Sequence, residues 1–278
     1  MLQAPDLERR FGGLVRLYGA AGAANIRAAH VVVVGIGGVG TWAAEALARS
    51  GVARLTLVDL DHIAESNINR QIHALGTTLG QSKVAAMRER IADINPNCDV
   101  RCVEEFVDPA NWPGVAQLDL QSDPSLAILD ACDQVKAKTA MAAWALQNKV
   151  SFITVGAAGG KRHAQKVEVE DLALATHDPL LAQLRYRLRK EHGAARQGKM
   201  GIDCVFSRES VMQPSSTPLL APDGTHSAQL GASSDNSLNC HGYGSVVSVT
   251  ATFGICAAGW LLDKIASQSF AKQSKITL

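Results

Sequence analysis

A run of four valines, residues 31–34, leads directly into the glycine pattern GIGGVG of residues 35–40. Four β-branched residues without alternation are typical of a central parallel strand that is buried on both faces. Residues 41–49, TWAAEALAR, are rich in strong helix formers and predict a helix. A strand, a glycine turn and a helix in this order predict a Rossmann-like nucleotide-binding turn, in which a phosphate lies at the helix N-terminus.

The glycines of this turn have separate predicted tasks. We expect Gly35 to allow the tight turn after the strand, Gly37 to let the backbone approach a phosphate, and Gly40 to allow close helix–strand packing. Gly38, between them, completes the predicted set of nucleotide-binding glycines. The pattern alone leaves NAD, FAD, S-adenosylmethionine and ATP possible, so an NAD-dependent oxidoreductase stays an alternative.

The next predicted strand, residues 55–58, ends at Asp59, where a carboxylate would accept hydrogen bonds from a ribose hydroxyl. A plain dinucleotide-binding fold would then continue into a helix. Here residues 61–71, DHIAESNINRQ, are polar and lack hydrophobic periodicity, so they predict a loop rich in hydrogen-bonding side chains. The candidate ATP-binding residues of this loop are Asp61, Asn67, Asn69, Arg70 and Gln71.

Two cations form a second group of candidate phosphate ligands. Arg70 lies in this loop, and Lys83 lies at the start of a predicted helix over residues 83–94. Converging on one triphosphate, they would stabilise the charge that moves onto pyrophosphate as it leaves. A hydride-transfer enzyme has no use for this second cationic group. The pair therefore favours nucleotidyl transfer, although each cation taken alone could equally be an ordinary surface residue.

The order of these motifs resembles the ubiquitin-activating-enzyme-like adenylating family, which includes bacterial activators of the molybdopterin and thiamine pathways. The resemblance depends on SNINRQ at residues 66–71, GQSK at 80–83, INP at 94–96 and LDACD at 129–133. It implies ATP and Mg²⁺ as cofactors, with Asp133 holding the Mg²⁺ ion that bridges the phosphates. By the same resemblance, catalysis would depend on Arg70, Lys83 and Asp133. An alternative role for Asp133 is the N-cap of the helix that follows.

Two further runs narrow the branch of the family. Residues 9–19, RRFGGLVRLYG, and residues 198–209, GKMGIDCVFSRE, resemble the enzymes that dehydrate threonylcarbamoyladenosine in tRNA. The implied reaction uses ATP to activate the threonyl carboxylate, after which an internal nitrogen closes a ring. Sulfur-carrier activators commonly have paired C-x-x-C zinc motifs, and the six cysteines here form none, so we expect no zinc. Adenylation of a sulfur-carrier protein stays an alternative.

The resemblance also implies partners. They are a tRNA carrying threonylcarbamoyladenosine, a second copy of the chain, and a cysteine desulfurase or sulfur-acceptor protein. In sulfur-carrier activators an N-terminal arginine reaches the partner subunit's ATP. The simplest alignment puts Gly13 at that position, and Arg10 or Arg16 could substitute.

Cys240, beside His241 in the run NCHG, is the candidate for a reactive thiol. Related activating enzymes can carry a thioester cysteine on a mobile loop, whereas a loop cysteine without a covalent role is the other interpretation. A monovalent cation could order the loop near residues 232–243. Because the cysteines are unpatterned and no signal peptide is apparent, we expect a cytoplasmic location.

A basic run over residues 185–190, RYRLRK, predicts an exposed helix face. Its candidate contacts with tRNA phosphates are Arg185, Arg187, Arg189 and Lys190. The solvated face of an amphipathic helix explains the run equally well. Because 27 Lys and Arg against 26 Asp and Glu leave a net charge of only +1, any tRNA affinity must come from such local patches.

The chain has 278 residues, 47% of them hydrophobic, which is enough for one large core. We expect an α/β fold: a doubly wound, mostly parallel Rossmann-like sheet with helices on both faces and a smaller C-terminal lobe. Residues 1–24 would form a helical arm, 25–155 the ATP-binding half, and 156–278 the substrate-facing and dimerisation half of the same domain. The uncharged run 244–262 predicts a buried helix at a subunit interface, with membrane association the lesser alternative.

Overall fold

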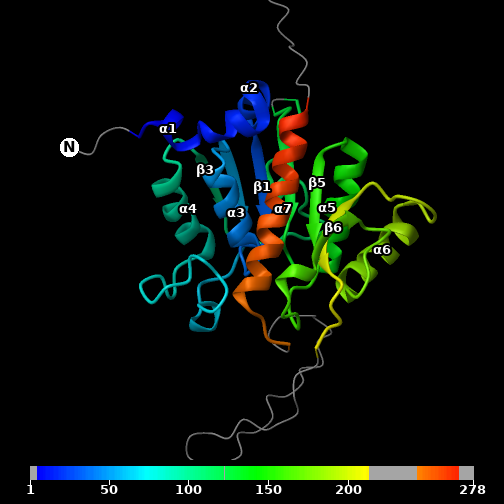
Figure 1. Ribbon diagram of the computed structural model, residues 1–278. Coiled ribbons are helices and arrows are strands. Elements are labelled where there is room, and N and C mark those ends of the chain that lie inside the picture. The colour runs from blue at the N-terminus through cyan, green and yellow to red at the C-terminus, as the bar shows by residue number, and fades with distance from the viewer. Residues whose placement is uncertain (1–4, 122, 213–242, 269–278) are drawn as a thin grey trace, which may run out of the picture.

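The computed structural model describes residues 5–121, 123–212 and 243–268. Its centre is one seven-stranded sheet in the order β3-β2-β1-β4-β5-β7-β6, in which only β6 runs antiparallel to its neighbour (Figure 1). The strands are β1 His30–Val34, β2 Arg54–Val58, β3 Asp99–Val103, β4 Leu126–Asp130, β5 Ser151–Val155, β6 Val167–Asp171 and β7 Asp203–Ser207. The predicted doubly wound, mostly parallel sheet is confirmed.

The strand order reverses between β1 and β4. From β1 the chain adds β2 and β3 on one side, then crosses back to place β4 and β5 on the other. In an open α/β sheet, this switch point lies between the carboxyl ends of the strands and is where ligands bind. The fold therefore places the glycine turn after β1 and the LDACD segment after β4 side by side.

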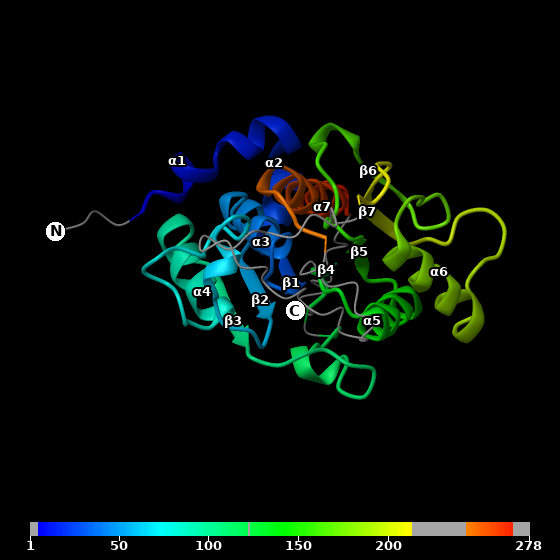
Figure 2. The same ribbon diagram turned by 90° about the horizontal axis from the view of Figure 1, so that it is seen from below.

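Helices cover both faces of the sheet (Figure 2). The α-helices are α1 Leu7–Phe11, α2 Gly13–Ala28, α3 Gly40–Arg49, α4 Lys83–Ile94, α5 Val135–Asn148, α6 Pro179–Glu191 and α7 Val247–Ser267. The first core joins α3, α4 and α7 to alternate residues of β1, such as Val31 and Val33. The second joins α5 and α6 to the residues between them, Val32 and Val34. Every residue of β1 is buried, as its run of β-branched residues predicted.

Helix α7 corresponds to the apolar run that predicted a buried helix, and it extends to Ser267. It is long and apolar enough to cross a membrane by length and composition, but half of its most apolar window is buried inside the protein. Phe253 and Leu261 are fully buried, and a Cβ on Gly254 would lie 2.4 Å from the Val39 carbonyl oxygen. This close approach identifies α7 as a core helix of the fold.

The N-terminal arm consists of α1 and α2, which continues beyond residue 24 to Ala28. The amide of Asn25 donates to three carbonyls at the end of α7, the shortest bond being 2.7 Å to Gln268. Figure 1 shows α2 beside the C-terminal end of α7, far from the cyan segment that precedes α4. The arm therefore lies at the amino ends of the strands, opposite the glycine turn.

Candidate nucleotide-binding and active site

The glycine turn joins β1 to α3. Gly35 has φ +87°, and a Cβ there would lie 2.8 Å from the backbone of Ala131. A Cβ on Gly40 would lie 1.7 Å from the Gly35 carbonyl oxygen, so both positions need glycine for backbone packing. Gly37 differs, because among the described residues, its two chain neighbours aside, a Cβ there would have no atom within 4 Å. The open space above Gly37 suits a phosphate approaching the backbone.

Asp59 ties the end of β2 to this turn. Its carboxylate accepts hydrogen bonds from the backbone N–H of Ile36 at 2.6 Å and of Asp61 at 2.9 Å. Burial raises the pKa of this carboxyl, and the nearby Lys83 ammonium opposes the shift. Each carboxylate oxygen can accept more than one hydrogen bond, so Asp59 keeps capacity for a ribose hydroxyl.

Lys83 is the first residue of α4 and is buried. Its Nζ lies 2.6 Å from Oδ2 of Asp61 and 3.9 Å from Oδ1 of Asp59. Asp61, a candidate ATP ligand, therefore pairs with the lysine in this structure. To contact a phosphate, Lys83 has to exchange the half-exposed Asp61 carboxylate for the ligand.

Arg70 lies over the glycine turn. A Cβ on Gly38 would lie 3.2 Å from Cγ of Arg70, so the missing side chain makes room for the arginine. The guanidinium donates to the Ser66 carbonyl at 2.7 Å and to the Asn69 side chain at 3.0 Å. Asn69 in turn donates to the Ser245 carbonyl just before α7 at 3.0 Å. The structure thus brings Arg70 and Asn69 together beside Gly38.

Asn67 and Gln71 are both buried within the 61–82 segment. The Asn67 side chain accepts from the Ala64 N–H at 3.0 Å and so closes a local turn. Oε1 of Gln71 has no hydrogen-bond partner among the described residues. Both side chains are therefore buried in this structure, and neither is exposed to a ligand as the sequence suggested.

Asp133 lies in the loop between β4 and α5 and is exposed. It is not the N-cap of α5: that residue is Gln134, and no side-chain cap bond to the described part of the chain forms there, so the N-cap alternative is wrong. Among the described residues, no group of three or more His, Cys, Asp or Glu side chains could hold a metal ion. A single exposed carboxylate fits Mg²⁺ nevertheless, because Mg²⁺ is usually bound by one or two carboxylates together with substrate phosphates.

Three of the predicted catalytic residues are each linked to the glycine turn. Arg70 packs on Gly38, and Lys83 lies beside Asp59, which bonds to the turn. Asp133 follows two residues after Ala131, whose backbone contacts Gly35. All three therefore lie at the carboxyl edge of the sheet, near the glycine turn.

The basic side chains of α6 have partners within the chain. Nη1 of Arg185 donates to the carbonyls of Leu172 and Ala175 at 3.0 and 2.8 Å, so this side chain holds the segment before α6. It also lines a hollow of about 360 Å³ beside His177 and Asp178. This bonding to its own chain competes with the tRNA phosphate contact that the sequence suggested for Arg185.

The other three basic residues are less constrained. Arg187 pairs with Glu191 at 3.3 Å, and Lys190 lies 5.6 Å from the ring centre of Tyr186. Arg189 donates to a backbone carbonyl at 3.1 Å. These are surface contacts that a nucleic-acid phosphate could replace at little cost.

Cys240 and most of the 232–243 loop lie outside the described residues. Burial raises the pKa of every described cysteine, in the case of Cys98 to about 12. The cysteines affected are Cys98, Cys102, Cys132, Cys204 and Cys256. None of these five is an activated thiol.

The N-terminal arginines differ from each other. Arg10 donates to the carbonyls of Asp93 and Ile94 at 3.0 and 2.7 Å, so it caps the C-terminus of α4. Arg16, on α2, is exposed. Because the arm lies at the amino ends of the strands, neither arginine is near the glycine turn of its own chain.

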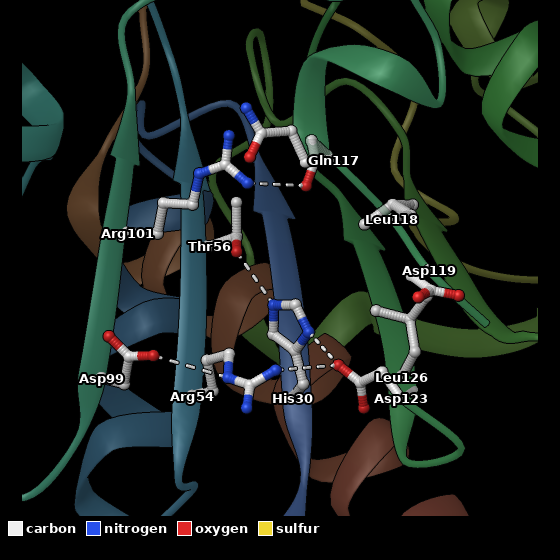
Figure 3. A pocket seen from close by; sticks show the side chains of 11 residues that line it. His30, Arg54, Thr56, Asp99, Arg101, Gln117, Leu118, Asp119, Asp123 and Leu126 are labelled. Atoms are coloured by element: carbon white, nitrogen blue, oxygen red, sulfur yellow. Dashed lines mark hydrogen bonds and ion pairs between the residues drawn. The ribbon is translucent and has the colours of Figure 1, made fainter. Parts of the chain in front are cut away.

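A polar network that sequence reasoning missed lies at the amino end of the sheet, around a hollow of about 220 Å³ (Figure 3). Nδ1 of His30 lies 2.5 Å from Asp123, and Nε2 lies 2.9 Å from the Thr56 hydroxyl. Arg54 bridges Asp123 at 3.3 Å and Asp99 at 3.5 Å. No local signal links these residues, because they come from separate strands and a loop.

The sequence pattern of the ThiF family matches residues 11–276. This chain belongs to the ThiF family. It is 43% identical to the tRNA threonylcarbamoyladenosine dehydratase of Escherichia coli over 265 residues, which cover 94% of this chain and 95% of that protein. The family resemblance that the motifs indicated is therefore confirmed.

Solved structures of this ThiF-family relative agree with the fold. Crystal structures of the Escherichia coli tRNA N6-threonylcarbamoyladenosine dehydratase with ATP and with AMP each have a TM-score of 0.78, at 38% and 40% identity. Both cover 95% of this chain and 97% of the other. By contrast, this chain is 32% identical to the Escherichia coli molybdopterin-synthase adenylyltransferase, and that similarity covers 46% of this chain and 49% of that enzyme.

Proposed function

We propose that this chain catalyses the ATP-dependent dehydration of N6-threonylcarbamoyladenosine in tRNA to its cyclic form. The observation that carries the proposal is similarity to a dehydratase over nearly the whole of both chains, including the C-terminal half. The similarity to the molybdopterin-synthase adenylyltransferase covers less than half of this chain, which disfavours the sulfur-carrier alternative. The cationic residues at the glycine turn disfavour hydride transfer.

The proposed reaction has to activate the threonyl carboxylate of the modified adenosine. A carboxylate oxygen is a poor leaving group, and transfer of the adenylyl group from ATP, with loss of pyrophosphate, makes it a good one. Attack by an internal nitrogen on the same carbonyl forms the C–N bond that closes the ring and breaks the C–O bond to AMP. AMP leaves with the former carboxylate oxygen, and the nitrogen loses its proton to solvent, so the nucleoside has lost the elements of water. The AMP complex of the Escherichia coli relative supports adenylyl rather than phosphoryl activation.

The residues of this chain have distinct tasks in that reaction. The turn at Gly37 binds phosphate through backbone N–H groups, and Asp59 orients the ribose. Lys83, released from Asp61, and Arg70 stabilise the charge that develops on the departing pyrophosphate. Asp133 would hold Mg²⁺, which neutralises phosphate charge when bound.

The finer parts of the proposal concern partners. We infer that Arg187, Arg189 and Lys190 contact tRNA, since their present contacts lie at the surface. We also propose a cytoplasmic homodimer, consistent with Ile255 of α7 being 52% exposed. A sulfur-acceptor protein acting with Cys240 and a monovalent cation near residues 232–243 remain part of the hypothesis.

Mass spectrometry of nucleosides tests the function. Modified tRNA is incubated with protein, Mg²⁺ and ATP, and the expected result is loss of one water from threonylcarbamoyladenosine. Arg70→Ala and Lys83→Ala should abolish the change, whereas Arg88→Ala, an exposed cation on the same helix as Lys83, should retain it. An unchanged nucleoside with the wild-type protein overturns the proposal. Pyrophosphate exchange that needs a carrier protein would favour the sulfur-carrier alternative instead.

A further inference from the structure

A fully buried ion pair lies behind the loop that carries Asp133. Lys138, on α5, has no exposed surface, and neither has Asp130 at the end of β4. The Lys138 ammonium donates to Oδ2 of Asp130 at 3.0 Å, to the Thr154 hydroxyl at 3.0 Å and to the Val155 carbonyl at 2.8 Å. All three of its protons are therefore used inside the protein.

The other oxygen of Asp130 holds the loop itself. Oδ1 accepts from the backbone N–H of Cys132 at 3.2 Å and from its thiol at 3.0 Å. Oδ2 also accepts from the Thr154 hydroxyl at 2.6 Å. One carboxylate thus ties β4, β5 and α5 to the residue that immediately precedes Asp133.

The ion pair is hard to explain by stability alone. Burying two charges costs several kcal/mol of hydration, and well-packed apolar residues often stabilise a core as well or better. What an apolar pair cannot do is accept the two hydrogen bonds from Cys132. The position of the loop also matters for the glycine turn, because the backbone of Ala131 already lies against Gly35.

We propose that Asp130 and Lys138 are positioning residues, which hold the 131–134 loop so that the Asp133 carboxylate stays at the glycine turn. Lys138 fixes the Asp130 carboxylate, and Asp130 fixes the backbone of Cys132. Neither side chain touches substrate. The proposal rests on the proposed function, because the Mg²⁺ role of Asp133 belongs to that function.

The test combines Asp130→Leu, which removes the acceptor for Cys132, with the double variant Asp130→Leu/Lys138→Met, which also leaves no unpaired buried charge and so folds where the single variant fails. Hydrogen exchange of the 131–134 amides is measured in the protein without nucleotide. Calorimetry then measures ATP affinity with Mg²⁺ and with EDTA. We expect at least tenfold faster exchange in the loop and at least tenfold weaker ATP binding with Mg²⁺, with less than a twofold change in EDTA.

Glu45→Gln is the control, because it weakens the ion pairs of a buried carboxylate with the partly exposed Arg90 and the exposed Arg49, away from this loop. It should leave the loop exchange rates and the Mg²⁺ dependence of ATP binding unchanged. A folded double variant with wild-type exchange and wild-type Mg²⁺ dependence overturns the positioning role. If Asp133→Asn leaves the Mg²⁺ dependence unchanged, the Mg²⁺ assignment in the proposed function is at fault, and the exchange rates alone decide the positioning role.

Discussion

The two ends of the sheet both carry clusters of polar side chains, but in opposite conditions. At the amino end, His30, Asp123 and Thr56 form hydrogen bonds with one another around the hollow of Figure 3. At the carboxyl end, Asp133 is exposed and accepts from the Gln134 amide at 3.4 Å, and a Cβ on Gly37 would meet none of the described residues apart from its chain neighbours. Polar groups that saturate one another hold chain segments together, whereas groups with capacity left can bind a ligand.

The comparison teaches that a hollow is a poor guide to the site. The residues that line the amino-end hollow form hydrogen bonds with one another, and these bonds hold segments of the fold together. The carboxyl-end residues lie at the switch point of the sheet, where fold topology places ligands. The predictions below separate the two conditions.

The largest expected difference comes from the same substitution made at each end. Asp133→Asn should lower kcat/KM for dehydration by roughly 100-fold or more, because Mg²⁺ and phosphate charge lose their ligand, without changing Tm. Asp123→Asn should cost about 1–2 kcal/mol of unfolding free energy, since His30 and Arg54 lose the negative charge of their shared partner, and should keep full activity. Steady-state kinetics and urea unfolding measure the two. Equal losses of activity in both variants would remove the distinction.

Two glycines of the turn separate the role of backbone packing from that of ligand binding. Gly40→Ala should destabilise the protein by roughly 3 kcal/mol, because its Cβ would collide with the Gly35 carbonyl. Gly37→Ala should leave stability within about 0.5 kcal/mol and weaken ATP binding at least about tenfold, because its Cβ enters the open space. Thermal unfolding and calorimetric titration with ATP separate these effects. Normal ATP affinity in folded Gly37→Ala protein would show that phosphate binds elsewhere.

His73, in the segment between β2 and α4, differs from the exposed polar groups of the carboxyl end. It is buried, and neither ring nitrogen has a hydrogen-bond partner in the described part of the chain. Burial lowers its pKa to about 4, with Lys83 and Arg90 adding to the effect. The folded state therefore resists protonation, so stability present above about pH 6.5 is lost as the pH falls towards 4. From pH 7.5 to 5.0 the loss from this residue should be about 2 kcal/mol.

His73→Leu should remove that part of the pH dependence, which urea unfolding at the two pH values measures. Other titrating groups remain in both proteins, so the difference between the two slopes isolates this residue. Identical slopes for the wild type and the variant would show that His73 is solvated or paired in the folded protein.

The smallest effects concern the arm at the amino end. Arg10→Ala should cost about 1 kcal/mol, because the last carbonyls of α4 lose their donor. Arg16→Ala, which removes an exposed side chain, should leave the free energy of unfolding within about 0.5 kcal/mol. Urea unfolding of both variants measures this difference. A larger loss for Arg16 than for Arg10 would reverse their assignment.

Local pattern determined much of this protein. The strand before the glycine turn, the helix that begins at Lys83 and the buried C-terminal helix all follow from residue type and spacing, which act within a few residues of the chain. The order of the glycine turn, the SNINRQ segment and the LDACD segment was enough to indicate the family, because parallel strands bring their carboxyl ends to one edge.

Tertiary structure alone decided which polar groups are available. Lys83 pairs with Asp61, and Arg185 donates to backbone carbonyls of its own chain. Asp130 and Lys138 are buried together behind the loop that carries Asp133. The reason is physical: a side chain's partners come from whichever strand or loop the fold brings against it. Burial likewise depends on the face of the sheet or helix that is covered, and residue type within a short segment does not encode either property.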